Sequence, residues 1–197
     1  MRDFRDYRDC LERQGLKPSH VVLVADLGEK ILRHYRGQRR VGELPFSLSE
    51  APPSCREGSL GTPWGLHVVC EKYGAGDPAG TVFIGRRATG QTWWQREDAG
   101  PLQKNLVTTR ILRLRGLEPG LNAGPGRDSY DRYIYIHGTN HLERFPENLS
   151  SGCLLMRDED LVGIYPQVAT GTHLWIPEPG EIQGARKEFA QGKLPES

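Results

Sequence analysis

The chain has 197 residues, and its 26 basic and 25 acidic side chains leave a formal net charge of +1. This balance argues against nucleic acid as the main partner, because phosphate binding needs a clustered excess of Lys and Arg. No stretch approaches the roughly 18 apolar residues that a membrane span requires, and the N-terminus lacks the apolar segment of a secretory signal. Abundant glycine (24) and proline (14) favour one domain of short strands joined by turns.

The four cysteines, Cys10, Cys55, Cys70 and Cys153, form neither a CxxC pair nor a tight metal-like spacing. Without an export signal, such residues are most simply free thiols in a reducing compartment. We therefore expect a cytoplasmic protein, with the periplasm as the alternative if a signal has been removed from the sequence.

The first elements in chain order are a helix and a hairpin. Apolar residues at helical spacing over residues 3–14 predict a short amphipathic helix, carried by an N-terminal appendage at residues 1–19. The β-branched run at 21–26, a turn, and residues 30–35 predict a β-hairpin. Residues 42–63 are rich in Gly, Pro and Ser and are expected to form a loop.

Further strands are predicted within a catalytic domain at residues 20–177, and Asp158 is expected to cap its one internal helix. The expected fold is therefore mainly β, with a short helix directly after a cysteine-containing turn. A polar tail at residues 178–197 includes a loose helix over 182–191. The predicted strands lie at residues 66–70, 81–85, 107–114, 132–137 and 173–176.

The chemistry centres on Cys153, which follows a Ser-X-Gly turn (Ser150-Ser151-Gly152-Cys153). A histidine, His137, ends the apolar strand upstream. The nucleophile of thiol acyl transfer is the thiolate, and a nearby imidazole generates it by taking the proton. The glycine permits a tight turn and can aim backbone N–H groups at the oxyanion that forms during attack.

These motifs resemble the L,D-transpeptidase (YkuD-type) catalytic domain over roughly residues 20–177. The resemblance is carried by Ile136-His137-Gly138-Thr139, by Ser151-Gly152-Cys153-Leu154-Leu155-Met156 and by Gly171-Thr172-His173-Leu174-Trp175-Ile176, in that order, and by the earlier stretch from Gly61 to His67. It implies a β-sandwich and a cysteine that attacks the bond between a diamino acid's L-centre and the next D-amino acid in peptidoglycan stem peptides.

By matching position, the resemblance makes Cys153 the nucleophile and His137 the base, with the Gly138 carbonyl orienting the imidazole. The N–H groups of Gly152 and Cys153 become the oxyanion donors. Carbapenem-type inhibitors are expected to acylate such a cysteine. No cofactor or metal is required, and the loop between His137 and His141 argues against helical zinc ligation. Candidate substrate-binding residues are Thr139, Ser151, Arg110, Tyr135 and His67.

Two departures from the family pattern affect the substrate rather than the nucleophile. Ser151 replaces the usual histidine before Gly-Cys, and Leu155 replaces a usual polar Arg or Asn. The second change removes a side chain that could contact a substrate carboxylate, and by residue type Arg110 and Arg132 are candidates for the missing cation.

Three functions remain open from the sequence. In the cytoplasm, water would accept the acyl group from soluble muropeptides, which makes the enzyme an L,D-carboxypeptidase that removes terminal D-alanine from tetrapeptides during muropeptide recycling. The alternatives are an L,D-transpeptidase, which forms cross-links or exchanges D-amino acids, and a non-catalytic protein that binds stem peptides.

Overall fold

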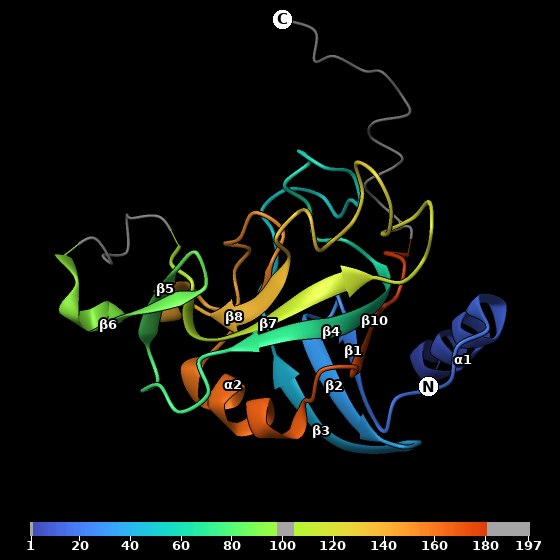
Figure 1. Ribbon diagram of the computed structural model, residues 1–197, viewed down its shortest axis with the longest axis horizontal. Helices are drawn as coiled ribbons and strands as arrows, with labels where there is room; N and C mark the ends of the chain where they lie inside the picture. The colour runs from blue at the N-terminus through green and yellow to red at the C-terminus, as the bar shows by residue number, and fades with distance from the viewer. Residues whose placement is uncertain (1, 98–104, 181–197) are drawn as a thin grey trace, which may run out of the picture.

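The computed structural model describes residues 2–97 and 105–180, so the helix expected over 182–191 lies outside the described residues. The described part contains two α-helices and ten strands (Figure 1). In chain order they are α1 (Arg2–Gln14), β1 (Val21–Asp26), β2 (Ile31–Arg36), β3 (Arg39–Pro45), β4 (Gly65–Tyr73), β5 (Thr81–Ile84), β6 (Arg87–Thr92), β7 (Thr108–Gly116), β8 (Tyr135–Gly138), β9 (Leu154–Met156), α2 (Asp158–Ile164) and β10 (His173–Ile176).

The strands form one mixed sheet in the order β3-β2-β1-β10-β4-β7-β5-β6. The sheet branches at β7, which pairs with β5 and also with β8, while β9 pairs with β8. Two pairs are parallel, β1 with β10 and β8 with β9. The second of these pairs places the predicted histidine strand beside the residues that follow Cys153.

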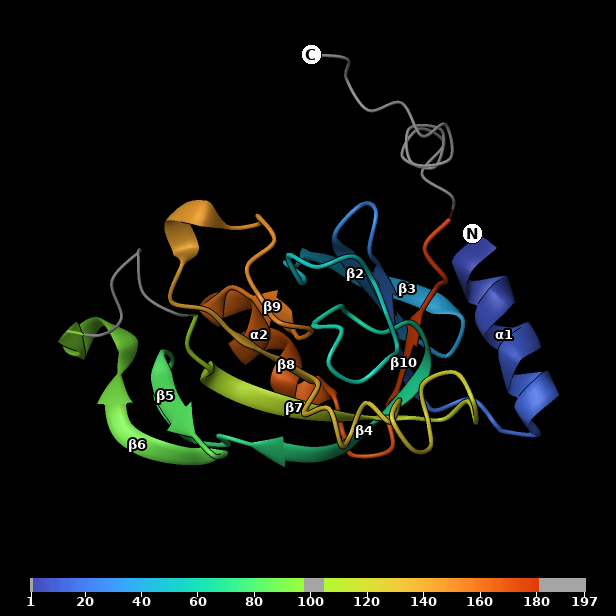
Figure 2. The ribbon, with the colours of Figure 1, turned by 90° about the horizontal axis from the view of Figure 1, so that it is seen from above.

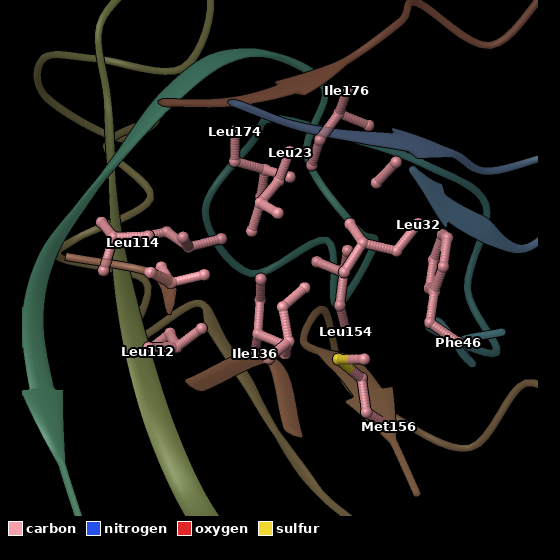
Figure 3. Close-up of a cluster of buried hydrophobic side chains, with 14 of the residues drawn as sticks. Leu23, Leu32, Phe46, Leu112, Leu114, Ile136, Leu154, Met156, Leu174 and Ile176 are labelled. Carbon is pink, nitrogen blue, oxygen red and sulfur yellow. The ribbon is translucent and has the colours of Figure 1, made fainter. Parts of the chain in front are cut away.

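The main core lies between the two arms of this curved sheet. Figure 3 shows Leu23, Leu174 and Ile176 from β1 and β10 facing Ile136 and Leu154 from β8 and β9. Helix α2 lies alongside β7 and β8 and adds Leu161 and Ile164 to the same cluster. The expectation of a mainly β fold is confirmed.

The outer face of β1 is covered by α1 (Figure 2). Alternation along β1 directs Leu23 into the main core and Val22 and Val24 toward Tyr7 and Leu11 of the helix. Burial on both faces explains why β1 is a continuous apolar run. The amphipathic helix is thus confirmed, while the boundary drawn at residue 19 stays a prediction. No helix among the described residues is long and apolar enough to cross a membrane.

Several local predictions were wrong. Strands β3, β6 and β9 were not predicted, and β4 continues to Tyr73, beyond the strand expected at 66–70. The strand expected at 132–137 begins only at Tyr135, because the chain turns at Tyr133 with φ = 56°. Asp158 does not cap α2, since the N-cap is Arg157 and Asp158 is the first helical residue.

Candidate active site

The turn before Cys153 is closed by the side chain of Ser150. Its Oγ accepts a hydrogen bond from the Gly152 N–H (3.2 Å) and donates one to the Cys153 carbonyl (2.6 Å). Gly152 has φ = 122°, and a Cβ there would lie 2.9 Å from Ile134 Cδ1. Only glycine fits this position, so the turn that presents the sulfur depends on it.

The Cys153 sulfur is half-buried against the beginning of β8. It accepts a hydrogen bond from the Tyr135 N–H (3.4 Å) and lies 3.6 Å from the Tyr133 carbonyl, to which the S–H donates. The parallel register pairs Ile136 with Leu154, so Cys153 is level with Tyr135. Side chains alternate along strands, and Cys153 therefore shares the outer face of the sheet with Tyr135 and His137.

His137 is held in one orientation on this face. Its Nδ1 is 2.8 Å from the Gly138 carbonyl, which fixes the Nδ1–H tautomer and leaves the lone pair on Nε2. The ring packs edge-on against Tyr135, with centroids 6.5 Å apart. The fold thus brings the predicted base and nucleophile to the same tyrosine.

Gly138 is enclosed by polar atoms behind the histidine. A Cβ at this position would lie 2.5 Å from Thr108 Oγ1, 2.7 Å from Asp158 Oδ1 and 2.8 Å from Thr109 Oγ1. Asp158 is buried and also accepts a hydrogen bond from Trp93 Nε1 (3.1 Å). Asp158 and its neighbours therefore fix the backbone whose carbonyl orients His137.

Burial keeps both members of the pair neutral. It raises the pKa of Cys153 to about 11, although the Tyr135 N–H and the positive charge of Arg132 act in the opposite direction. It lowers the pKa of His137 to about 4, opposed by the bond to the Gly138 carbonyl. At neutral pH the site therefore holds a thiol and a neutral imidazole whose Nε2 lone pair is free to act as a base.

Three other predicted residues have structural contacts. His67 is fully buried, with Nδ1 3.0 Å from the Gly65 carbonyl and Nε2 2.9 Å from Ser129 Oγ. Thr139 Oγ1 donates to Asn105 Oδ1 (2.6 Å). Arg110 is directed toward Tyr165, the residue directly after α2, and its guanidinium carbon is 5.6 Å from the centre of that ring.

Ser151 and Arg132 lie nearer to Cys153. Ser151 is exposed on the Cys153 turn. The positive charge of Arg132 acts to lower the pKa of Cys153. Its guanidinium, however, already donates to the carbonyls of Ser54 (2.9 Å) and Gly61 (2.6 Å). Arg132 therefore stabilises the loop beside the site. Across the described residues, no group of three or more His, Cys, Asp or Glu side chains comes together as a metal site.

Sequence reasoning missed two features of the site. Arg86, from the turn between β5 and β6, donates to Tyr135 Oη (3.1 Å). Asp158 was interpreted as a helix cap, although its carboxylate supports Gly138. No sequence signal connects Arg86 to residues so distant in the chain; for Asp158 the signal was ambiguous, because an acid at a helix start is usually a cap.

A comparison with family models identifies the fold and family together. The model for the L,D-transpeptidase catalytic domain, YkuD, matches residues 20–178. The chain belongs to the YkuD family of L,D-transpeptidase catalytic domains. The resemblance carried by the motifs around His137 and Cys153 is thereby confirmed. No match was found among curated proteins.

Several solved structures are similar to this chain at low sequence identity. One, an L,D-transpeptidase from Xylanimonas cellulosilytica, is 16% identical, with a TM-score of 0.50, and covers 82% of this chain and 62% of its own. L,D-transpeptidase 3 from Mycobacterium tuberculosis, in complex with a faropenem-derived adduct, is 17% identical (TM-score 0.49; 81% and 60%). The cell shape determining protein Pgp2 from Campylobacter jejuni is 19% identical (TM-score 0.47; 84% and 49%). The chain thus spans between 49% and 62% of the length of these structures.

Proposed function

We propose that this YkuD domain is a cysteine acyl-transfer enzyme that cleaves peptidoglycan stem peptides at the L,D bond. The observation that carries the proposal is the common packing of Cys153 and His137 on Tyr135, with the imidazole fixed by the Gly138 carbonyl. A thiol and an oriented, neutral base on the same face of the sheet are the groups that nucleophilic catalysis needs.

In the first half-reaction, Cys153 Sγ attacks the carbonyl carbon of the diamino acid as its proton passes to His137 Nε2. The Cys153 N–H stabilises the oxyanion. The Gly152 N–H, the second predicted donor, is bound to Ser150 Oγ in the resting site and joins only if that bond is released. His137 then protonates the departing amine, the C–N bond breaks, and a thioester remains on Cys153.

In the second half-reaction, water attacks the thioester carbonyl while His137 accepts its proton, and the C–S bond breaks to restore the thiol. Water is the proposed acceptor because Cys10, Cys55, Cys70 and Cys153 are all free thiols, as is typical of a reducing compartment. Soluble muropeptides rather than wall polymer are the substrates there. The proposed activity is thus an L,D-carboxypeptidase in muropeptide recycling.

A product assay on a defined tetrapeptide tests this proposal. Mass spectrometry should detect tripeptide and D-alanine in equal amounts. Cys153→Ala should abolish cleavage, and His137→Ala should lower the rate about a hundredfold or more. Products that are dimers or D-amino-acid-exchanged peptides would instead establish transpeptidation.

A carbapenem distinguishes an enzyme from a non-catalytic binder. The intact protein should gain one carbapenem mass, located on Cys153 by peptide mapping. The matched control is Cys70→Ala, which removes another half-buried free thiol, on β4, and should keep the adduct. A folded protein that binds tetrapeptide but forms neither adduct nor product would be a binder.

A further inference from the structure

Arg86 lies in the tight turn between β5 and β6 and reaches the strand beside the nucleophile. Its Nη1 donates to Tyr135 Oη (3.1 Å), and its guanidinium carbon is 5.8 Å from the centre of the Tyr133 ring. These two tyrosines supply the backbone N–H and carbonyl that contact the Cys153 sulfur. The guanidinium is therefore one tyrosine side chain away from the reacting atom.

The charge of Arg86 is not neutralised within the described part of the chain, where its contacts are to tyrosines and not to a carboxylate. The three neighbouring arginines already have partners within the protein. Arg113 is paired with Glu71 (3.0 Å), Arg132 donates to backbone carbonyls, and Arg110 donates to the Thr109 carbonyl and faces the Tyr165 ring. Of these four arginines, Arg86 alone has neither a carboxylate nor a backbone carbonyl among its contacts in the described part of the chain.

The backbone of the turn fixes where this side chain begins. Gly85 and Arg86 have φ values of 55° and 66°, as both central residues of a two-residue type I′ turn require. Glycine adopts this conformation freely, whereas a residue with a Cβ does so at a cost. The bond to Tyr135 and the contact with Tyr133 hold the guanidinium over the same face of the sheet as Cys153.

The substrate carries an anion at the matching place. When a tetrapeptide is cleaved at its L,D bond, the departing D-amino acid bears its carboxylate on the carbon next to the scissile nitrogen. Leu155, where the family has a polar residue, is fully buried and cannot bind this group. Arginine matches a carboxylate with two parallel hydrogen bonds.

We propose that Arg86 binds the carboxylate of the terminal D-amino acid, an inference that rests on the function proposed for Cys153. Arg86 is then a specificity-determining residue. It selects peptides whose last residue is the D-amino acid of the L,D bond over longer or amidated peptides. Only a free C-terminal D-amino acid places a carboxylate beside the attacked carbonyl.

Binding measured without turnover tests this role. In a Cys153→Ala background, calorimetry compares a tetrapeptide with a free C-terminal carboxylate and the same peptide as an amide. The parent should prefer the acid. Arg86→Gln should weaken acid binding about 10–100-fold, as expected for a lost charged pair, and leave amide binding unchanged. Arg86→Lys should restore part of the preference.

Arg87→Gln is the matched control, because it removes the same charge from the exposed neighbouring residue. It should keep the acid preference. An unchanged acid-to-amide ratio in Arg86→Gln, or an equal loss in Arg87→Gln, overturns the proposal. Thermal unfolding verifies that each variant is folded.

Turnover separates this inference from the proposed function. In the active enzyme, Arg86→Gln should raise KM for the acid far more than it lowers kcat. If the wild-type enzyme cleaves the acid and the amide equally well, the role of Arg86 is refuted while the function stands. If it neither cleaves the tetrapeptide nor forms a thioester with a carbapenem, the proposed function itself fails.

Discussion

Replacing Gly138 by alanine tests the packing behind His137, the proposed base. The added Cβ would lie 2.5–2.8 Å from three oxygens, Thr108 Oγ1, Thr109 Oγ1 and Asp158 Oδ1. These oxygens belong to one buried hydrogen-bonded cluster, so none can move away without breaking a bond. Overpacking costs about 1–3 kcal/mol, and a weakened buried hydrogen bond adds about 1 kcal/mol.

The expected loss of stability is therefore about 2–4 kcal/mol, or a fall in Tm of roughly 4–16 °C for a domain of this size. Gly163→Ala is the control, because it lies on the exposed face of α2 and a Cβ there meets nothing within 4 Å. Alanine should stabilise that helix by about 0.4–1 kcal/mol. The two substitutions thus add the same methyl group and are expected to change the stability in opposite directions.

Calorimetric unfolding measures both effects, and the rate of carbapenem acylation below both transitions measures the site. A displaced Gly138 carbonyl releases His137, so Gly138→Ala should also acylate more slowly, whereas Gly163→Ala should not. A Tm within about 2 °C of wild type for Gly138→Ala would refute the packing argument. A destabilised variant with the wild-type rate would show that the carbonyl does not orient the base.

Three further predictions concern titration and the N-terminal helix. The rate of cleavage should fall below an apparent pKa of about 4, because His137 becomes protonated there and loses its basic lone pair. The rate should be level from about pH 5 to 9, because Cys153 stays a thiol over this range. A stopped assay of the rate against pH measures this, and a fall already at pH 6–7 would contradict it. Alkylation of Cys153 by iodoacetamide should accelerate about tenfold per pH unit between pH 7 and 9, since only the thiolate reacts. Peptide mapping should show that the buried Cys10 stays unmodified. A rate that does not depend on pH would reveal a preformed thiolate on Cys153. Tyr7→Phe removes the hydroxyl that lies 2.9 Å from the buried His173 Nδ1 and should lower the free energy of unfolding by about 1–3 kcal/mol in denaturant titrations, and unchanged stability would show that this bond contributes nothing.

The turn before Cys153 and the strand that carries His137 were predictable because their signals are local. Gly152 before Cys153 marks a backbone that must turn, and the alternation that ends at His137 marks a strand edge. Neither inference needs to know what packs on the strand. The motifs before and after these residues occur in the order typical of the YkuD family, and this order identified the family.

The supporting residues were not predictable because their partners are distant in the sequence. Arg86 meets Tyr135 across 49 positions, and Trp93 meets Asp158 across 65. The three residues of β9 form a strand only because β8 and Ser47 supply pairing on either side. Tertiary pairing, not intrinsic propensity, determines such short strands.

Burial of Cys153 and His137 also explains why we expect the thiol to lose its proton only when substrate is bound. The same desolvation that raises the pKa of Cys153 lowers that of His137, so transfer of the proton to the imidazole is unfavourable in the empty site. The transfer becomes favourable when the sulfur bonds to the carbonyl carbon and the negative charge moves to an oxygen near backbone N–H groups. We therefore expect thiolate character to arise with the transition state, where stabilisation increases the rate. An arginine that places the substrate carboxylate beside Tyr135 aligns that carbonyl with the sulfur, and positioning of this kind lowers the same barrier.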